Sequence, residues 1–375
     1  MKFSCTKSNL AQALGMVGGL ANKSANLPIL ANILIKADLQ KVELCATNLE
    51  LAIITNVRSK IEKEGSFTVP ARTLTEFINL MPEDRVDIEM AENELLINCG
   101  KSSTKIKGVS AEDFPVIPTV SEGKGYLVKA EDLKKGLSQI MPAVAKSDIR
   151  PELSGVFLGF NINGNNLVLA ATDSYRLAEK KISLLQGNDE LKIILPGRTA
   201  QEIMRMVSSV ESVESEGEKN VRLLISDNQL VLNYDSMQMI SRLVEGQYPD
   251  YTQIIPKEFK TTAEFSTNQM IKEIKAASLF TTAGVNSVSI DINVSQSSIG
   301  VSSTSTQTGE YSSEITSEAS GEENSILLNH KYVLDGLANI NNEVTILKAI
   351  SADSPCLFIP KGDDSYLYIA MPIRQ

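Results

Sequence analysis

The stretch Leu169-Ala170-Ala171-Thr172-Asp173-Ser174-Tyr175-Arg176-Leu177-Ala178 lies in the middle of the chain and ends a run of alternating apolar and polar residues. An earlier copy of its pattern, Ala46-Thr47-Asn48-Leu49-Glu50-Leu51-Ala52, begins 125 residues upstream. A fainter third copy, Ser303-Thr304-Ser305, follows about 132 residues downstream. This spacing is the size of a whole domain and is far too long for a solenoid repeat. The sequence therefore predicts three copies of one module.

A second repeated segment supports the same period. The segment from Phe67 to Ile78 matches the segment from Ile194 to Met204, with Pro, Arg, Thr and Glu at identical offsets 126 residues apart. Its third counterpart runs from Ile326 to Asp335. Thr73 and Thr199 each lie three residues before a glutamate, a spacing that predicts a capping box at the start of a helix.

Each module is expected to contain two helices and about eight strands. Leu10, Leu14 and Val17 recur at helical spacing after Ser8, which is a plausible N-cap, and Ser266 or Thr267 would cap a comparable helix in the third module. We predict an α+β fold in which the helices lie on one face of antiparallel sheets. The predicted boundaries are residues 1–120, 126–248 and 254–375, with hinges near 118–126 and 248–260, which are rich in proline and polar residues.

The composition is that of a globular protein with a substantial core, since 42% of the 375 residues are hydrophobic and 22% are charged. The chain has no apolar run long enough for a membrane helix, and its start lacks the apolar segment of a signal peptide. We expect a cytoplasmic protein. Cys5, Cys45, Cys99 and Cys356 are widely separated, which favours buried thiols over a zinc site or a disulfide framework.

The sequence contains no catalytic motif that we recognise. His330 is the only histidine, no nucleophile motif lies near it, and phosphate-binding glycine loops and metal-loop spacings are absent from the sequence. We therefore expect a non-catalytic protein without cofactor or metal. Because the net charge is −10, DNA would be repelled by the protein as a whole, and any DNA partner must meet a locally basic surface.

Taken together, four segments resemble the bacterial DNA sliding clamps, the beta subunits of DNA polymerase III. They are Ala171 to Ala178, Ile194 to Arg198, Tyr248 to Tyr251 and the terminal Met371-Pro372-Ile373-Arg374, and the resemblance extends over the whole chain. It implies a head-to-tail homodimer whose six modules close a ring around duplex DNA, with the helices lining the hole. Such a ring would be a processivity factor for the replicative polymerase. Topological linkage would then replace tight phosphate binding.

The family also implies which residues approach DNA. Eight basic and six acidic residues lie on the predicted helices, a net charge of +2 that is compatible either with a mildly basic lumen or with ordinary solvated helix faces. Ser24 stands where an arginine is often found. The residues assigned to DNA contact are Lys23, Ser24, Arg72, Lys134, Lys135, Lys146, Arg150, Arg198, Arg205, Lys272 and Lys275.

Clamps of this family bind short linear peptides from the polymerase alpha subunit, the clamp loader, repair polymerases and mismatch-repair proteins, in a groove between modules two and three. Asn329 and Arg176 could hold the peptide backbone, and the apolar walls would receive leucine or phenylalanine. Ser174-Tyr175 replaces a frequent Gly-His, so peptide preference can differ; alternatively, the C-terminal tail is only an edge strand. The implied walls are Leu153, Thr172, Ser174, Tyr175, Arg176, Leu177, Pro249, Ile254, Asn329, Tyr332, Ser354, Ile369, Met371, Pro372, Ile373 and Arg374.

Charge patterns independently predict the contact between subunits. Lys101, Lys105 and Lys107 share one strand face in module one, while Glu310, Glu314 and Glu318 have even spacing in module three. Opposite charges would pair these edges, and like charges would discourage the wrong pairings. Leu279 and Ile106 are candidates for an apolar centre. The predicted interface contains Lys101, Thr104, Lys105, Ile106, Lys107, Ser278, Leu279, Glu310, Glu314 and Glu318.

One hypothesis of another class remains at this point: a triplicated, β-rich ligand- or peptide-binding protein with no role in nucleic-acid metabolism. Retention on circular DNA but not on linear DNA would distinguish a clamp from such a protein.

Overall fold

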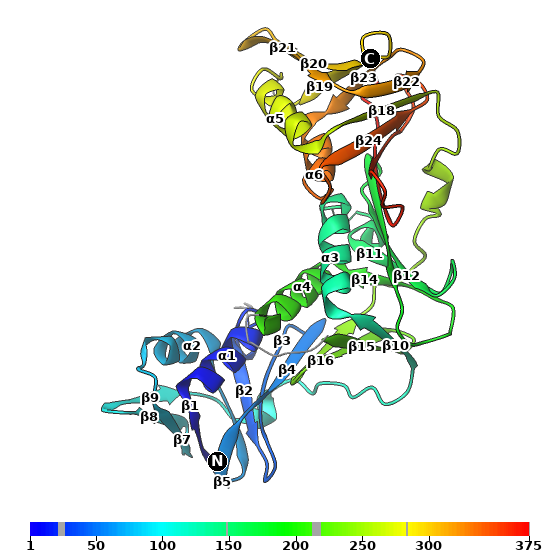
Figure 1. Cartoon of the computed structure of the whole chain (residues 1–375). Helices are drawn as coiled ribbons and strands as arrows, with labels where there is room; N and C mark the ends of the chain where they lie inside the picture. The colour runs from blue at the N-terminus through cyan, green and yellow to red at the C-terminus, as the bar shows by residue number, and fades with distance from the viewer. Residues whose placement is uncertain (22–26, 148, 212–218, 283, 375) are drawn as a thin grey trace. The chain divides into compact units, whose positions relative to one another are not determined.

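A computed structural model describes residues 1–21, 27–147, 149–211, 219–282 and 284–374 (Figure 1). Lys23 and Ser24, which we assigned to DNA contact, lie outside the described residues. None of the helices in the described ranges has both the length and the apolar character needed to cross a membrane. The chain forms two compact units, one of residues 1–130, 185–187 and 205–243, and the other of residues 131–184, 188–204 and 244–375.

The first unit contains two antiparallel sheets. A five-stranded sheet has the order β5-β1-β7-β8-β9, and an eight-stranded sheet has the order β10-β15-β16-β17-β4-β3-β2-β6. The strands are β1 (Lys2–Thr6), β2 (Asn32–Ala37), β3 (Val42–Thr47), β4 (Leu51–Val57), β5 (Ser59–Lys63), β6 (Gly65–Pro70), β7 (Arg85–Ala91), β8 (Glu94–Cys99), β9 (Ser102–Lys107), β10 (Lys124–Lys129), β15 (Asn220–Ile225), β16 (Gln229–Tyr234) and β17 (Met237–Arg242).

The second unit also contains two antiparallel sheets. A nine-stranded sheet has the order β14-β11-β12-β13-β26-β25-β24-β18-β22, and a four-stranded sheet has the order β21-β20-β19-β23. The strands are β11 (Gly155–Phe160), β12 (Asn166–Thr172), β13 (Arg176–Ser183), β14 (Leu191–Pro196), β18 (Thr261–Ser266), β19 (Ser287–Asn293), β20 (Ser298–Ser305), β21 (Gly309–Thr316), β22 (Glu318–Gly321), β23 (Asn324–Asn329), β24 (Val344–Ala349), β25 (Cys356–Pro360) and β26 (Tyr366–Ala370).

Helices pack on the sheets in pairs. Helix α1 packs on α2 and on strands β3 and β4, while α5 packs on α6 and on β20 and β21 (Figure 1). Leu10, Leu14 and Val17 of α1 are all fully buried, which confirms the stripe predicted for this helix. The helices are α1 (Lys7–Gly18), α2 (Ala71–Leu80), α3 (Ala130–Ile140), α4 (Gly197–Glu211), α5 (Thr267–Ser278) and α6 (His330–Leu337).

The predicted helix caps are only partly right. Ser266 caps α5 as expected. The cap of α1 is Thr6, whose hydroxyl accepts a hydrogen bond from the backbone amide of Asn9 at 3.3 Å, so the assignment to Ser8 was wrong. The capping boxes at Thr73 and Thr199 were also wrong, because both threonines lie inside helices that already begin at residues 71 and 197. Proline at residue 70 fixes the entry of α2 without a side-chain cap.

The repeated loops have the same internal hydrogen bonds, which explains the similarity of their sequences. The Thr47 hydroxyl donates to the carbonyl of Leu51 at 2.9 Å, and the Thr172 hydroxyl donates to the carbonyl of Arg176 at 2.7 Å. At the tip of each loop a residue other than glycine has positive φ, 77° at Leu49 and 76° at Ser174. This conformation costs about 1–2 kcal/mol for an L-residue, so the surrounding hydrogen bonds must hold it in place.

Within each unit, one sheet continues from one module into the next. In the first unit β17, the last strand of module two, pairs with β4 of module one. In the second unit β26, the last strand of module three, pairs with β13 of module two. Each junction is therefore an antiparallel ladder between the closing strand of one module and the strand that follows the repeated loop of the preceding module.

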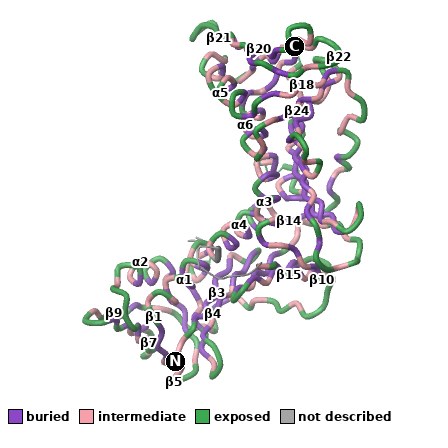
Figure 2. The backbone as a smooth tube through the Cα atoms, in the orientation of Figure 1, coloured by how far each residue is buried: buried purple, intermediate pink, exposed green. Residues whose placement is uncertain are grey.

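The cores lie between the helices and the sheets. In Figure 2 the strands β3 and β4 are mostly buried, whereas the edge strand β9 is largely exposed. All four cysteines are free and buried, as predicted. Burial raises the pKa of the Cys45 and Cys356 thiols to about 12, which keeps them protonated and unreactive at neutral pH.

Candidate functional site

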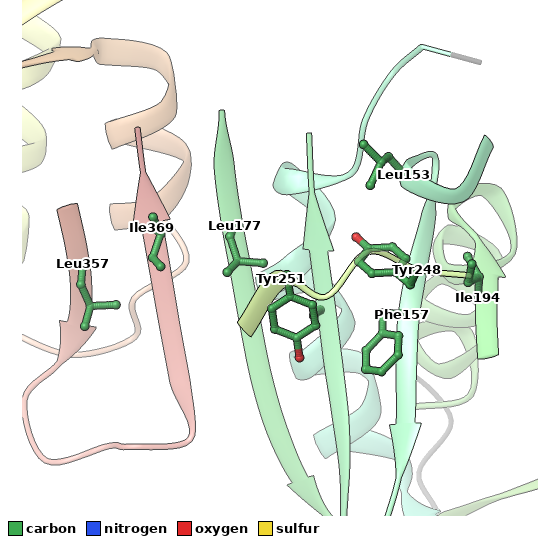
Figure 3. Packing of buried hydrophobic residues seen from close by; sticks show 9 residues of the cluster. Leu153, Phe157, Leu177, Ile194, Tyr248, Tyr251, Leu357 and Ile369 are labelled. Carbon is green, nitrogen blue, oxygen red and sulfur yellow. The ribbon is translucent and has the colours of Figure 1, made fainter. Parts of the chain in front are cut away.

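An apolar cluster lies where β13 of module two meets β26 of module three, in the second unit. Leu177 and Ile369 are cross-strand partners in this ladder, and both are fully buried. Figure 3 shows Tyr251 next to Leu177, with Phe157 and Tyr248 on the side away from Ile369. The members of this junction cluster are Leu153, Phe157, Ala170, Leu177, Ile194, Tyr248, Tyr251, Leu357 and Ile369.

Three aromatic rings form the centre of the junction cluster. The centroid of the Phe157 ring lies 5.5 Å from that of Tyr248 and 5.8 Å from that of Tyr251, at tilted and edge-to-face angles. The Tyr251 hydroxyl donates a hydrogen bond to the buried carboxylate of Glu179 at 2.7 Å. Burial and the neighbouring Glu179 raise the pKa of Tyr251, so the phenol stays protonated and remains a donor.

The Tyr248 hydroxyl bonds to the backbone at the start of the repeated loop. It accepts a hydrogen bond from the backbone amide of Thr172 at 3.0 Å. Burial raises the pKa of Tyr248, which keeps its hydroxyl neutral. The sequence prediction placed Thr172 at this site but left out Tyr248 and Phe157. Tyr248 could have been found from the sequence, because Tyr248-Pro249 repeats the pair Phe114-Pro115 at the end of module one. The structure shows that both aromatic residues are buried.

The loop from Thr172 to Arg176, hereafter the rim loop, is held mainly by Asp173. One Asp173 carboxylate oxygen accepts hydrogen bonds from the backbone amides of Tyr175 and Arg176, both at 3.0 Å. The other oxygen accepts from Nε of Arg176 at 2.9 Å. These bonds fix the conformation in which Ser174 has positive φ and Tyr175 points into solvent with 62% of its surface exposed.

Arg176 also connects the rim loop to α6. Its Nη1 donates to the Asp335 carboxylate, and its Cζ lies 4.6 Å from the centroid of the Tyr332 ring. The Tyr332 ring in turn stacks on Tyr175, with 6.3 Å between the two centroids. Burial lowers the pKa of Arg176, but Tyr368, Asp335 and Asp173 outweigh it and raise the pKa overall. The guanidinium is therefore permanently charged, although its side chain is only 7% exposed.

The C-terminal tail runs alongside the rim loop. The backbone amide of Met371 donates to the carbonyl of Tyr175 at 2.9 Å, and the amide of Ile373 donates to the carbonyl of Leu327 at 2.8 Å. Met371 also packs against the junction cluster. The tail is thus attached to both modules.

The structure brings most of the predicted peptide-site residues to this junction, but it gives two of them other tasks. The Asn329 side chain accepts a hydrogen bond from the amide of Lys331 at 3.0 Å and caps α6. Arg176 is engaged by two carboxylates. These bonds use the carbonyl oxygen of Asn329 and the Nε and Nη1 groups of Arg176, so a peptide backbone would have to bond to the other N–H groups of these two side chains. Ser354 bonds to the Ser351 hydroxyl at 2.8 Å, and Ile254, which ends a short 3-10 helix, is 36% exposed.

Six of the ten predicted interface residues lie on two strands that are sheet edges in the described chain. Strand β9 is an edge of the five-stranded sheet, and β21 is an edge of the four-stranded sheet. Lys105, Lys107, Glu310 and Glu314 are exposed on these strands, and Lys101 is exposed in the turn before β9. Leu279, just after α5, is 70% exposed and suits an apolar contact.

Two interface assignments need correction. Ile106 is only 5% exposed, because successive strand residues alternate between faces and its side chain points into the core of its own module. It cannot form the apolar centre of a contact with another subunit. Glu318 does not share a strand with Glu310 and Glu314, since the chain leaves β21 at residue 316 and Glu318 begins β22 in the nine-stranded sheet.

The basic residues assigned to DNA contact have different surroundings. Arg198, Lys135, Lys146, Lys272 and Lys275 are exposed. Arg72 forms an exposed ion pair with Glu76 at 2.7 Å, and Arg150 forms one with Glu152 at 2.9 Å. Arg205 differs from these, because its guanidinium donates to the carbonyls of Gly15 at 2.9 Å and Met16 at 2.6 Å near the end of α1. Its charge thus serves the packing of α4 on α1. Lys134 of α3 is half-buried.

Comparisons with known proteins cover the whole chain. Residues 1–118 match the family model for the N-terminal domain of the DNA polymerase III beta subunit, residues 127–250 match that for its central domain, and residues 252–374 match that for its C-terminal domain. The beta sliding clamp of Staphylococcus aureus is 29% identical over 386 residues, which cover 100% of this chain and 99% of that protein.

Solved structures agree with the sequence comparisons. The sliding clamp from Bacillus subtilis superposes with a TM-score of 0.93 at 26% identity, with coverage of 100% of this chain and 99% of that one. A sliding clamp from Pseudomonas aeruginosa bound to griselimycin has the same fold, with a TM-score of 0.93 at 23% identity and full coverage of both chains.

Proposed function

Because the chain belongs to the DNA polymerase III beta subunit family, we propose that two copies join head to tail into a ring that encircles duplex DNA and tethers the replicative polymerase. The family is that of a non-catalytic accessory subunit of the polymerase. Its alternative, a triplicated binding protein unconnected with DNA, is not favoured by any of the matches.

The observation that carries this proposal is the pattern of sheet continuation. The closing strands β17 and β26 each pair with the strand after the repeated loop of the preceding module, β4 and β13. The third closing strand is β9 of module one. The third strand that follows a repeated loop is β21 of module three. Both are sheet edges in the described chain. A second copy supplies each edge with its missing neighbour, and two such contacts close the assembly.

The register of this contact follows from the register of the ladder between β4 and β17. Cys99 pairs with Ser102 at the end of the β8–β9 hairpin, and Tyr234 pairs with Met237 at the end of the β16–β17 hairpin. Ser102 of β9 therefore corresponds to Met237 of β17. Ile315 of β21 corresponds to Val57 of β4, since each is the last buried residue of its strand. In β4 and β17, Ala52 lies opposite Ile240. If the contact between copies has the same register, Glu310 of one copy lies opposite Lys105 of the other.

The same register would place Glu314 opposite Lys101 and leave Lys107 opposite Thr308, which carries no charge. Cross-strand pairs of opposite charge each favour pairing by a few tenths of a kcal/mol to about 1 kcal/mol. The two charge pairs would therefore select this register over a slipped one. Charge patterns read from the sequence and the register read from the structure thus support the same contact.

The proposed DNA-facing residues are those of the helices and loops named above, with Arg205 contributing least because its donors already bind carbonyl groups. Exposed cations such as Arg198 and Lys275 would contact phosphates loosely, which suits a protein that must slide. No sequence preference is expected, since the ring would hold DNA by linkage.

The junction cluster, the rim loop and the tail are the proposed docking site for short partner peptides. Met371, which is half-buried against the junction cluster, and the exposed ring of Tyr175 offer an apolar surface suited to leucine or phenylalanine anchors. Leu177 and Ile369 are fully buried and contribute to the core behind this surface. The proposed partners are the polymerase alpha subunit, the clamp loader, repair polymerases and mismatch-repair proteins. We place the assembly in the cytoplasm with the replication machinery.

A primer-extension assay tests the proposal. The polymerase core and clamp loader copy a singly primed circular template with and without this chain, in the presence of a polymerase trap, so that each product reflects one binding event. The proposal expects products longer by at least about tenfold when the chain is present. The matched control is the variant Lys105→Glu, whose dimer contact should be weakened. Equal product lengths with and without the wild-type chain would contradict the proposed function.

A further inference from the structure

We propose that Asp335 is a positioning residue for partner binding: it holds Arg176 so that Tyr332 on α6 keeps a fixed place beside the rim loop. This inference rests on the proposed peptide-docking function of the junction. It assigns no peptide contact to Asp335 itself.

The geometry shows that Arg176 bridges two modules. The residue starts β13 in module two, and its guanidinium binds Asp173 of the rim loop on one side and Asp335 of α6 in module three on the other. The Tyr332 ring lies against the guanidinium at 4.6 Å, one turn of helix before Asp335. The Tyr368 hydroxyl donates to the carbonyl of Tyr332 at 2.8 Å and closes the network on the third side.

Burial makes this network strongly dependent on its partners. The Arg176 side chain is 7% exposed and that of Asp173 is 16% exposed, so the cation has little access to water. Asp335 is 46% exposed, and one face of its carboxylate meets solvent. A buried cation that loses one of its carboxylates moves toward solvent or toward its other partner. Loss of Asp335 alone would thus leave Arg176 with only its contact to the Tyr332 ring on α6, while Asp173 still holds it to the rim loop.

Of the two module junctions seen in the described residues, only the one between modules two and three contains this network. The counterpart of Arg176 in module one is Leu51, which is buried and uncharged, although its loop has the same hydrogen bonds as the rim loop. The sheet ladder with β17 forms there without such a cation. Joining two modules therefore does not require the charge network. Its presence where the apolar cluster and the tail meet connects it with the docking site.

The consequence for binding is preorganisation. A peptide that contacts both the rim loop and the tail binds best when the distance between them is fixed. The stacking of Tyr175 on Tyr332 fixes the position of the exposed Tyr175 ring between the rim loop and the tail. If the network is broken, only a fraction of the molecules has this arrangement. The apparent affinity then falls to that fraction of its full value.

The test compares Asp335→Asn, Asp335→Glu and the control Glu343→Gln, which removes an exposed carboxylate elsewhere in module three. Binding of fluorescein-labelled griselimycin and of a labelled linear peptide with adjacent leucine and phenylalanine is followed by fluorescence anisotropy. We expect Asp335→Asn to weaken binding about tenfold, Asp335→Glu to restore it to within about threefold of wild type, and Glu343→Gln to leave it unchanged. Dimer mass should stay the same in all three, and binding is measured well below the thermal midpoint of each variant, because removing a carboxylate from a buried cation also lowers stability.

Arg176→Lys is the second variant, because a lysine keeps the charge but cannot hold both carboxylates in fixed directions. It should show the loss seen with Asp335→Asn even if that variant folds poorly. Wild-type affinity of Asp335→Asn, or a loss confined to Arg176→Lys, would overturn the inference, since Arg176 would then act without Asp335. Failure of the wild-type chain to bind either probe would instead reject the docking site itself.

Discussion

Reversing one charge on β9 should separate the subunits. In the proposed register Lys105 faces Glu310 of the partner copy, and the two side chains lie on the exposed face of the continued sheet. Two unit charges about 4 Å apart in a water-like environment interact by about 1 kcal/mol. Lys105→Glu converts this attraction into a repulsion of similar size, a change of about 1–2 kcal/mol for each interface. Because a closed dimer has two interfaces, the dimer should weaken by about 2–4 kcal/mol, or roughly 30- to 1,000-fold.

Sedimentation equilibrium over a range of protein concentrations measures this change. Lys107→Glu is the matched control, because Lys107 lies on the same strand face but opposite the uncharged Thr308, and we expect less than about a threefold effect. The double variant Lys105→Glu with Glu310→Lys should recover most of the dimer affinity, whereas Lys105→Glu with Glu314→Lys should not. Equal effects of Lys105→Glu and Lys107→Glu would refute the register, and an unchanged dimer would refute the edge contact.

Three further changes test local features. Ser174→Gly should stabilise the protein against urea by about 0.5–1 kcal/mol because glycine adopts positive φ without strain, whereas Ser138→Gly within α3 should destabilise it by a similar amount. Burial, followed by the neighbouring Lys331, lowers the pKa of His330, so the unfolded chain gains a proton first as the pH falls below 6.5; stability should then decline with falling pH, and urea titrations of His330→Gln should show a smaller decline. Asp363→Asn leaves the buried Lys180 cation without the carboxylate that lies 3.3 Å away and should lower the thermal midpoint by several degrees, more than Glu264→Gln does, because the partner of Glu264 is the exposed Lys361.

Repetition made the fold predictable from the sequence. The alternation of apolar and polar residues that ends at Ala171 corresponds to a strand. The repeated Pro, Arg, Thr and Glu residues that begin at Pro196 correspond to the start of a helix. Local signals were less decisive at helix starts. Thr6 and Ser8 both carry hydroxyls, and the cap is Thr6 because its backbone is extended while Ser8 is already helical.

The long-range part of the site could not be derived from local patterns. Arg176 and Asp335 are 159 residues apart, and nothing in either neighbourhood indicates that they form an ion pair. The error at Glu318 has a related cause, because even spacing of glutamates does not reveal that the chain changes sheets after residue 316. Family resemblance indicated the proposed docking surface but not the side chains beneath it, such as Tyr248 and Phe157.

Retention on circular DNA tests the central claim most directly. Radiolabelled clamp is placed on nicked circular plasmid by a clamp loader, separated from free protein by gel filtration, and half of the sample is then cut once with a restriction enzyme. A ring that encloses the duplex without gripping it should remain with the intact circles and should leave the linear molecules within minutes. Equal retention on both forms, or retention on neither, would contradict encirclement by the head-to-tail dimer.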